Sequence, residues 1–202
     1  PLAIVPVTVY PFTGRATAQS ATPEVPVIRS LDGKTPKIHP SCFVSETAYI
    51  VGDVEIGEDT SIWPGAVIRG DYGKIIIGKA CSIQDNCVLH TDDYLELGDN
   101  VLMTHGAVIH GGIVGNNVLI GMNAAILESA KVGNYVLIGA SALVLADAVI
   151  PDNSLVLGVP GKVRPLTAEH RERLEDPTGI YVENMKRYIK AGLGLQIPTD
   201  GQ

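Results

Sequence analysis

Aliphatic residues recur every six positions through most of this 202-residue chain. Four positions after nearly every one of them stands a small residue, and glycine often follows the aliphatic directly. A period of six fits neither a helix at 3.6 residues per turn nor a plain strand, so it predicts a short strand followed by a turn. The period is broken by a three-residue insertion after the sixth aliphatic residue, a two-residue insertion after the ninth and a one-residue deletion after the twelfth. The series consists of Ile38, Val44, Ile50, Ile56, Ile62, Ile68, Ile77, Ile83, Leu89, Leu97, Met103, Ile109, Val114, Ile120, Ile126, Val132, Ile138, Val144, Ile150 and Val156.

This pattern resembles the hexapeptide repeat of left-handed parallel β-helices, in which three hexapeptides make one triangular coil. It predicts an all-β fold, a left-handed parallel β-helix of about seven coils stacked roughly 4.8 Å apart. We assign residues 31–163 to this β-helix. The proline-rich residues 1–30 lack the repeat, and we expect an extended N-terminal arm there.

Beyond Val163 the repeat stops, and residues 164–202 form a C-terminal helical segment and tail. Residues 167–174 predict a short helix, which Asp176-Pro177 ends. A second helix is expected over about residues 179–191, packed alongside the β-helix. The residues that helical spacing places on its buried face are Tyr181, Met185, Tyr188 and Ile189.

Charge and composition exclude some partners. The net charge of −7 and the absence of a Lys/Arg-rich run argue against a nucleic-acid partner, and no apolar stretch is long enough to span a membrane. The three cysteines have no CxxC spacing, and they occupy the small-residue positions of the repeat, where they act as buried filler. A reducing cytoplasm fits this use of cysteine best. These cysteines are Cys42, Cys81 and Cys87.

Three of the five histidines fall where the repeat is irregular. Ile68, Leu89 and Ile109 are each three repeat positions apart, so the residues that follow them should stack on successive coils. Those residues are Arg69, His90 and His110. Two imidazoles about one coil apart can share a metal ion.

His105 is out of phase with that stack, because it lies two residues after Met103. A trimer would solve this, since a three-fold axis places one face of a subunit against a different face of its neighbour. His105 of one chain would then complete a site made by His90 and His110 of the next. Three neutral imidazoles suit Zn²⁺, with Fe²⁺ and Co²⁺ as alternatives, and they leave a position for water, as in catalytic sites.

With the β-helix and C-terminal helix, these residues resemble the γ-class carbonic anhydrase family over roughly residues 30–190. The resemblance implies a homotrimer with a metal at each subunit interface, held by the three histidines, and CO2/bicarbonate as the small-molecule substrate. It implies inter-subunit ion pairs near the site among Arg69, Asp71 and Asp85. It also implies that Gln84 positions the metal-bound solvent and that Tyr181 is the active-site tyrosine.

The chain departs from the family at several positions. Ser82, Tyr72 and Glu183 stand where the most active members or the archetype have Asn, Glu and Asn. The acidic loop that carries a proton-shuttling Glu in the archetype is missing after His90. Asp92 and Asp93 remain there as candidates for proton transfer.

We therefore expect a metal-dependent lyase that hydrates CO2 to bicarbonate, with proton transfer limiting its rate. One alternative is a metal-dependent acyl-CoA thioesterase. Another is a non-catalytic metal-binding assembly subunit whose site has degenerated. Hexapeptide acyltransferases share the repeat but do not require the stack of Arg69, His90 and His110.

Overall fold

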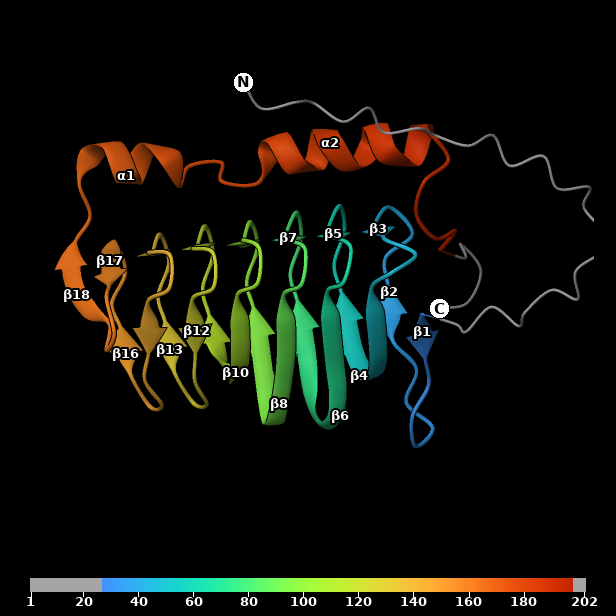
Figure 1. Cartoon of the computed structure of the whole chain (residues 1–202), viewed down its shortest axis with the longest axis horizontal. Coiled ribbons are helices and arrows are strands. Elements are labelled where there is room, and N and C mark those ends of the chain that lie inside the picture. The colour runs from blue at the N-terminus through green and yellow to red at the C-terminus, as the bar shows by residue number, and fades with distance from the viewer. Residues whose placement is uncertain (1–26, 198–202) are drawn as a thin grey trace, which may run out of the picture.

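The chain is a left-handed parallel β-helix with two helices along one side, as the repeat predicts. The computed structural model describes residues 27–197. Most of the arm expected at residues 1–30 therefore lies outside the described residues. Figure 1 shows the coils stacked side by side along the long axis, with α1 and α2 parallel to it.

The strands form two sheets that wrap around one core, and all pairings are parallel except that of β17 with β18. The eight-stranded sheet contains β3 (Phe43–Val44), β5 (Ser61–Ile62), β7 (Ser82–Ile83), β9 (Leu102–Met103), β11 (Leu119–Ile120), β14 (Leu137–Ile138), β17 (Ser154–Leu157) and β18 (Lys162–Pro165). The ten-stranded sheet contains β1 (Ile28–Arg29), β2 (Lys37–Ile38), β4 (Tyr49–Ile56), β6 (Val67–Ile77), β8 (Val88–Leu97), β10 (Val108–Val114), β12 (Ala125–Ile126), β13 (Lys131–Val132), β15 (Leu143–Val144) and β16 (Val149–Ile150).

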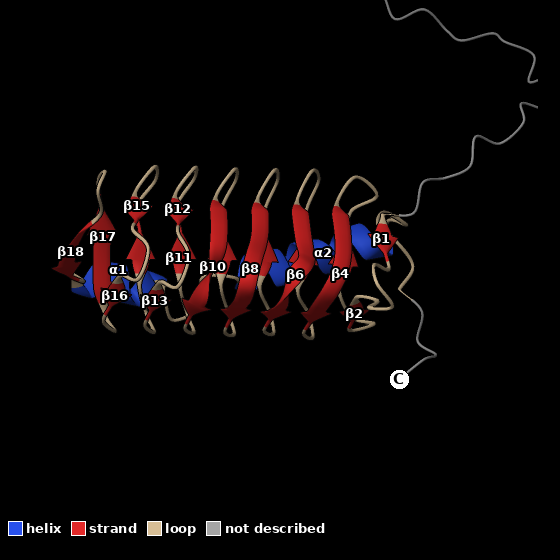
Figure 2. Cartoon of the chain, turned by 90° about the horizontal axis from the view of Figure 1, so that it is seen from below, coloured by secondary structure: helices blue, strands red, loops and turns tan. Residues whose placement is uncertain are grey.

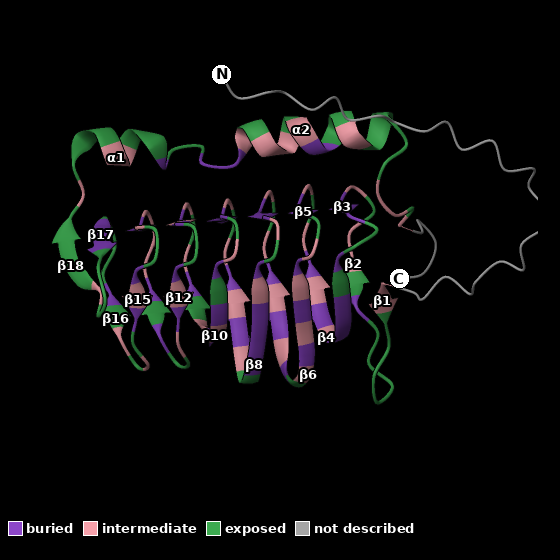
Figure 3. Ribbon diagram, viewed as in Figure 1, coloured by how far each residue is buried: buried purple, intermediate pink, exposed green. Residues whose placement is uncertain are grey.

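The core consists of the two phased series read from the sequence. Every member of the aliphatic series is buried except Ile38, which is partly buried and packs against the same core. Each such burial contributes about 1.5–3 kcal/mol to folding. Figure 3 shows this buried interior running the length of the solenoid. Burial also raises the pKa of each cysteine thiol to about 12, which makes Cys42, Cys81 and Cys87 poor nucleophiles.

The helices cover only the eight-stranded sheet. Helix α1 spans Ala168–Arg173, and its C-cap residue Leu174 is buried against that sheet. Helix α2 spans Gly179–Lys190 and packs Met185 against Phe43 and Trp63. Among the described residues, neither helix is long and apolar enough to cross a membrane.

One residue predicted on the buried face of α2 is wrong, namely Ile189. Val182, Met185 and Tyr188 make the contact with the sheet, whereas Ile189 is 46% exposed. Tyr188 packs edge-on against the rings of Phe43 and Trp63, and this aromatic cluster sets the rotation of α2 about its axis. Helical periodicity alone could not fix that rotation.

The irregular coils lengthen four strands of the ten-stranded sheet. Because β4, β6, β8 and β10 each continue around a corner, they cover two sides of the triangle where other coils have two short strands. Figure 2 shows these long strands on the open side of the molecule, with both helices behind them. The corner at which β6, β8 and β10 bend carries the site.

Candidate metal centre

The register of strands β6, β8 and β10 stacks the residues that the repeat count predicts to lie on the same corner of successive coils. Arg69 in β6 pairs with His90 in β8, and His90 pairs with His110 in β10. The ladder becomes irregular immediately after each of these residues, because the inserted residues turn the corner there. The two imidazole centroids lie 5.1 Å apart, which is about one coil spacing.

The two imidazoles present ring nitrogens to each other. His90 Nδ1 lies 3.2 Å from His110 Nε2, and His90 Nε2 lies 2.9 Å from Asp71 Oδ1. When the Nε2 proton of His90 is donated to Asp71, Nδ1 carries the lone pair and faces His110. A carboxylate on the far nitrogen is how proteins orient an imidazole that binds a metal.

This separation fits two ligands of one metal ion. Nitrogen ligands lie about 2.0–2.1 Å from Zn²⁺, and two such ligands in a tetrahedron are about 3.3 Å apart. Among the described residues, one group of metal-ligating side chains brings its ligand atoms within 4.8 Å of one another, namely His90, Asp92 and His110. The histidine pair therefore fits a divalent metal without rearrangement of the coils.

Asp71 is held by two partners in the same chain. Partial burial opposes its ionisation, but hydrogen bonds from Arg69 and His90 prevail and lower the pKa of Asp71 below its usual value. The carboxylate therefore stays charged at neutral pH and remains an acceptor for His90. Tyr72, the next residue, is 75% exposed, and its ring lies 6.4 Å from the His90 ring.

His105 lies at a different corner of the triangle. It follows β9 and pairs with Asp85, which follows β7, at 3.0 Å between Nδ1 and Oδ2. One chain therefore does not bring His105 to the His90–His110 pair, as its phase in the repeat predicts. Within the one chain, Arg69 forms an ion pair with Asp71, and Asp85 pairs with His105.

Gln84 and Tyr181, the two other residues expected in the active site, also lie away from the His90–His110 pair of the same chain. Gln84 directly follows β7, one residue before Asp85, and is 2% exposed. Its Oε1 is buried without a hydrogen-bond partner, one of two such side-chain atoms in the described part of the chain. Tyr181 is on α2, which contacts β3 and β5 on the helix-covered side.

A cavity of about 370 Å³ opens beside His110. Asp92, Asp93 and Tyr94 line it from one coil, and Glu128 and Lys131 line it from a later coil. The Oε2 atom of Glu128 lies 3.8 Å from His110 Nδ1. Glu128 was not expected at the site, because three repeat positions after Ile109 is Ile126, so the count places Leu127 next to His110 and Glu128 one residue further along.

Comparison with known proteins defines the class. The family described as bacterial transferase hexapeptide (six repeats) matches residues 35–70 and 111–146. A protein of Methanocaldococcus jannaschii named "Probable carbonic anhydrase" is 55% identical over 156 residues, which cover 76% of this chain and 94% of that protein. The Geobacillus kaustophilus protein named "Carbonic anhydrase" is 43% identical over 159 residues, covering 77% and 87% of the two chains.

The fold and the histidine stack thus define a hexapeptide-repeat β-helix protein. At these levels of identity, the chain belongs to the γ-class carbonic anhydrase family. A solved structure from Bacillus cereus, which carries the provisional name of an acetyltransferase, superposes with a TM-score of 0.79 at 40% identity. The superposition covers 81% of this chain and 97% of that one.

Proposed function

We propose that the protein hydrates CO2 to bicarbonate at a metal centre, as a lyase of the γ-class carbonic anhydrase type. One observation carries the proposal. His90 and His110 face each other through ring nitrogens at a separation that suits two ligands of one ion, and Asp71 holds the far nitrogen of His90. The carbonic anhydrase names of the two relatives support the same reaction.

His90 and His110 of one chain and His105 of another would hold the metal, with Zn²⁺ as first choice and Fe²⁺ or Co²⁺ as alternatives. When bound to imidazoles, such a metal supplies a nucleophile for hydration by lowering the pKa of water from 15.7 to about 7. Arg69 and Asp71 keep the His90 ring in place. Gln84 has an unpaired buried oxygen with which it can accept a hydrogen bond from solvent at the completed site.

A homotrimer is the assembly that this site needs. The corner with Asp85 and His105 and the corner with His90 are joined by one side of the triangle, and the outward residues of that side form a continuous apolar row. Its members, which pair in register from coil to coil and are partly to substantially exposed, are Tyr49, Val67, Val88, Val108, Ala125 and Leu143. We infer that this row packs against a second copy, which brings a His105 to each histidine pair.

Proton transfer to solvent is the step that we expect to limit the rate of CO2 hydration. Asp92 and Asp93 line the cavity beside His110, as does Glu128, and these carboxylates are the candidates to pass a proton to solvent. An ordinary aspartate has a pKa of about 3.9, so it is a poor proton acceptor at neutral pH. Tyr181 of a neighbouring subunit would orient solvent or substrate. The buried free thiols suit a reducing cytoplasm.

A CO2-hydration assay of metal-loaded protein across buffers tests the proposal. We expect the rate to rise with imidazole concentration and much less with a carboxylate buffer, because the pKa of imidazole lies near the working pH. His110→Ala is the control, since it should lose both metal and rate. No hydration by fully metal-loaded protein would contradict the proposal and would favour the degenerate assembly subunit.

Acyl chemistry is the second candidate. The structural similarity to a protein named as an acetyltransferase favours it, and a metal-activated nucleophile could hydrolyse an acyl-CoA thioester. Release of free thiol from short-chain acyl-CoA esters would reveal this activity. The two candidates separate cleanly, because the same loaded preparation can be assayed for both.

A further inference from the structure

We propose that Asp92 is an additional metal ligand, which lets a single chain bind a divalent cation through His90, Asp92 and His110 before a neighbour's His105 replaces the carboxylate. The inference rests on the proposed metal site and adds to it the order of its assembly.

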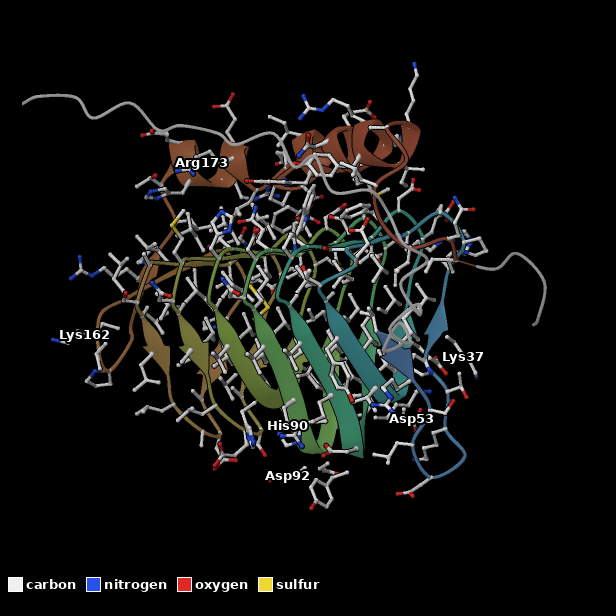
Figure 4. All side chains as sticks on the ribbon, turned by 45° about the vertical axis from the view of Figure 1, so that its right-hand side comes forward. Lys37, Asp53, His90, Asp92, Lys162 and Arg173 are labelled. Atoms are coloured by element: carbon white, nitrogen blue, oxygen red, sulfur yellow. The ribbon has the colours of Figure 1, made fainter. Side chains whose placement is uncertain are left out.

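Local geometry places Asp92 beside the histidine pair. His90 and Asp92 are two residues apart in β8, so their side chains leave the strand on the same side. Thr91 between them is buried, and its Oγ1 accepts a hydrogen bond from the Asp93 amide. Figure 4 shows His90 and Asp92 together at the lower edge of the sheet, on the side away from the helices.

The carboxylate of Asp92 is available for a metal. A carboxylate oxygen of Asp92 and one ring nitrogen from each histidine lie within 4.8 Å of one another, whereas Asp93 is not part of this cluster. The hydrogen bonds and ion pairs of the described residues leave the Asp92 carboxylate without a partner. Asp71, by contrast, is engaged by Arg69 and His90 and cannot turn toward the cation without breaking both contacts.

The coil above leaves room for this ligand. In the next coil His110 pairs with His90 and Gly112 pairs with Leu95, so Gly111 alone stands opposite the corner that contains Asp92, and the cavity of about 370 Å³ opens there. Two imidazoles and one carboxylate form a common ligand set for Fe²⁺ and Zn²⁺. A chain could therefore acquire its cation alone, and trimer formation would exchange the carboxylate for an imidazole and return Asp92 to the cavity.

The test measures binding of Co²⁺ alone, by its visible absorption, to the unchanged full chain and to four variants of it. His105→Ala removes the neighbour's ligand, and we expect it to keep binding Co²⁺ with weakened affinity. Adding Asp92→Asn to His105→Ala should weaken binding further by more than about tenfold, because the third ligand is gone. Adding Asp93→Asn instead, which removes the same charge from the next residue, should leave the affinity of His105→Ala unchanged.

The outcomes separate the inference from the proposed function. If His105→Ala binds no Co²⁺, or if the Asp92→Asn and Asp93→Asn double variants bind equally well, Asp92 is not a ligand. If His90→Ala, the fourth variant, still binds Co²⁺ like the unchanged chain, the proposed metal site itself fails. All of these substitutions lie outside the buried core cluster, and circular dichroism of each variant checks that the β-helix is intact.

Discussion

Two vertical stacks of polar side chains run along this solenoid, at different corners of the triangle. The first consists of Asp99, Asn116, Asn134 and Asp152, and the Oδ1 atom of each accepts a backbone N–H from the preceding coil at 2.7–2.9 Å. The second consists of Arg69, His90 and His110, whose side chains meet one another and Asp71. The side chains of the first stack hydrogen-bond to backbone amides, whereas in the second stack the ring nitrogens of two histidines face each other.

The difference shows how a repeat can carry polar residues in two ways. Where the period of six is intact near Asn116 and Asn134, side-chain oxygens reach the amides of the adjacent coil and stabilise the stacking. Where insertions lengthen β6 and β8, backbone pairing is interrupted at the corner, and the side chains there must find other partners. A metal ion is such a partner for the two imidazoles.

The largest expected effect comes from breaking the second stack. His110→Ala removes one of two ligands from the same chain, so we expect metal affinity to fall by at least about 100-fold and CO2 hydration to reach background. Asn116→Ala, in the first stack, should keep the metal. Metal analysis after dialysis and the hydration assay measure both. Metal retained by His110→Ala would show that the facing imidazoles are a hydrogen-bonded pair.

A glycine at the corner gives the next largest effect. Gly112 has φ +96°, and a Cβ placed there would lie 2.3 Å from the carbonyl oxygen of Ala130. Gly112→Ala should therefore lower the free energy of unfolding by about 1–3 kcal/mol and weaken metal binding, because β10 carries His110.

Gly192→Ala is the matched control for that substitution. Gly192 has φ +78° with no atom within 4 Å of its Cβ position, so the substitution adds backbone strain without a clash. Urea unfolding and Co²⁺ titration of both variants separate strain from displacement. Equal losses of stability with unchanged metal affinity would mean that the Ala130 carbonyl can move aside and that the corner does not position His110.

The coils and the histidine stack could be predicted because both follow from counting. A six-residue period with insertions after Ile68 and Leu89 fixes which residues share a corner, and the structure has His90 and His110 in that register. Counting cannot fix side-chain rotamers, so the hydrogen bond from His90 to Asp71 was not foreseen. For the same reason the exposure of Ile189 was not foreseen, since it depends on how the aromatic rings pack beneath α2.

The smallest expected effect tests whether the first stack is only structural. Asn134 Oδ1 accepts the amide and the side-chain Nδ2 of Asn116, at 2.9 and 3.0 Å. Asn134→Ala removes these bonds at an exposed position, where water can replace the lost acceptor, so the free energy of unfolding should fall by only about 0.5–1.5 kcal/mol. Co²⁺ affinity should stay within about twofold, because sites without shared partners behave independently.

Asn134→Asp sharpens this last comparison. It keeps the Oδ1 acceptor for the Asn116 amide but places a second carboxylate next to Asp152, to which Asn134 now donates through Nδ2. We expect a loss of stability that shrinks as salt screens the two charges, whereas the loss in Asn134→Ala should not depend on salt. Urea unfolding at low and high ionic strength distinguishes the two. If either variant lowers Co²⁺ affinity in proportion to its loss of stability, the two stacks are coupled through the coils. The first stack would then help to hold His90 and His110 in place.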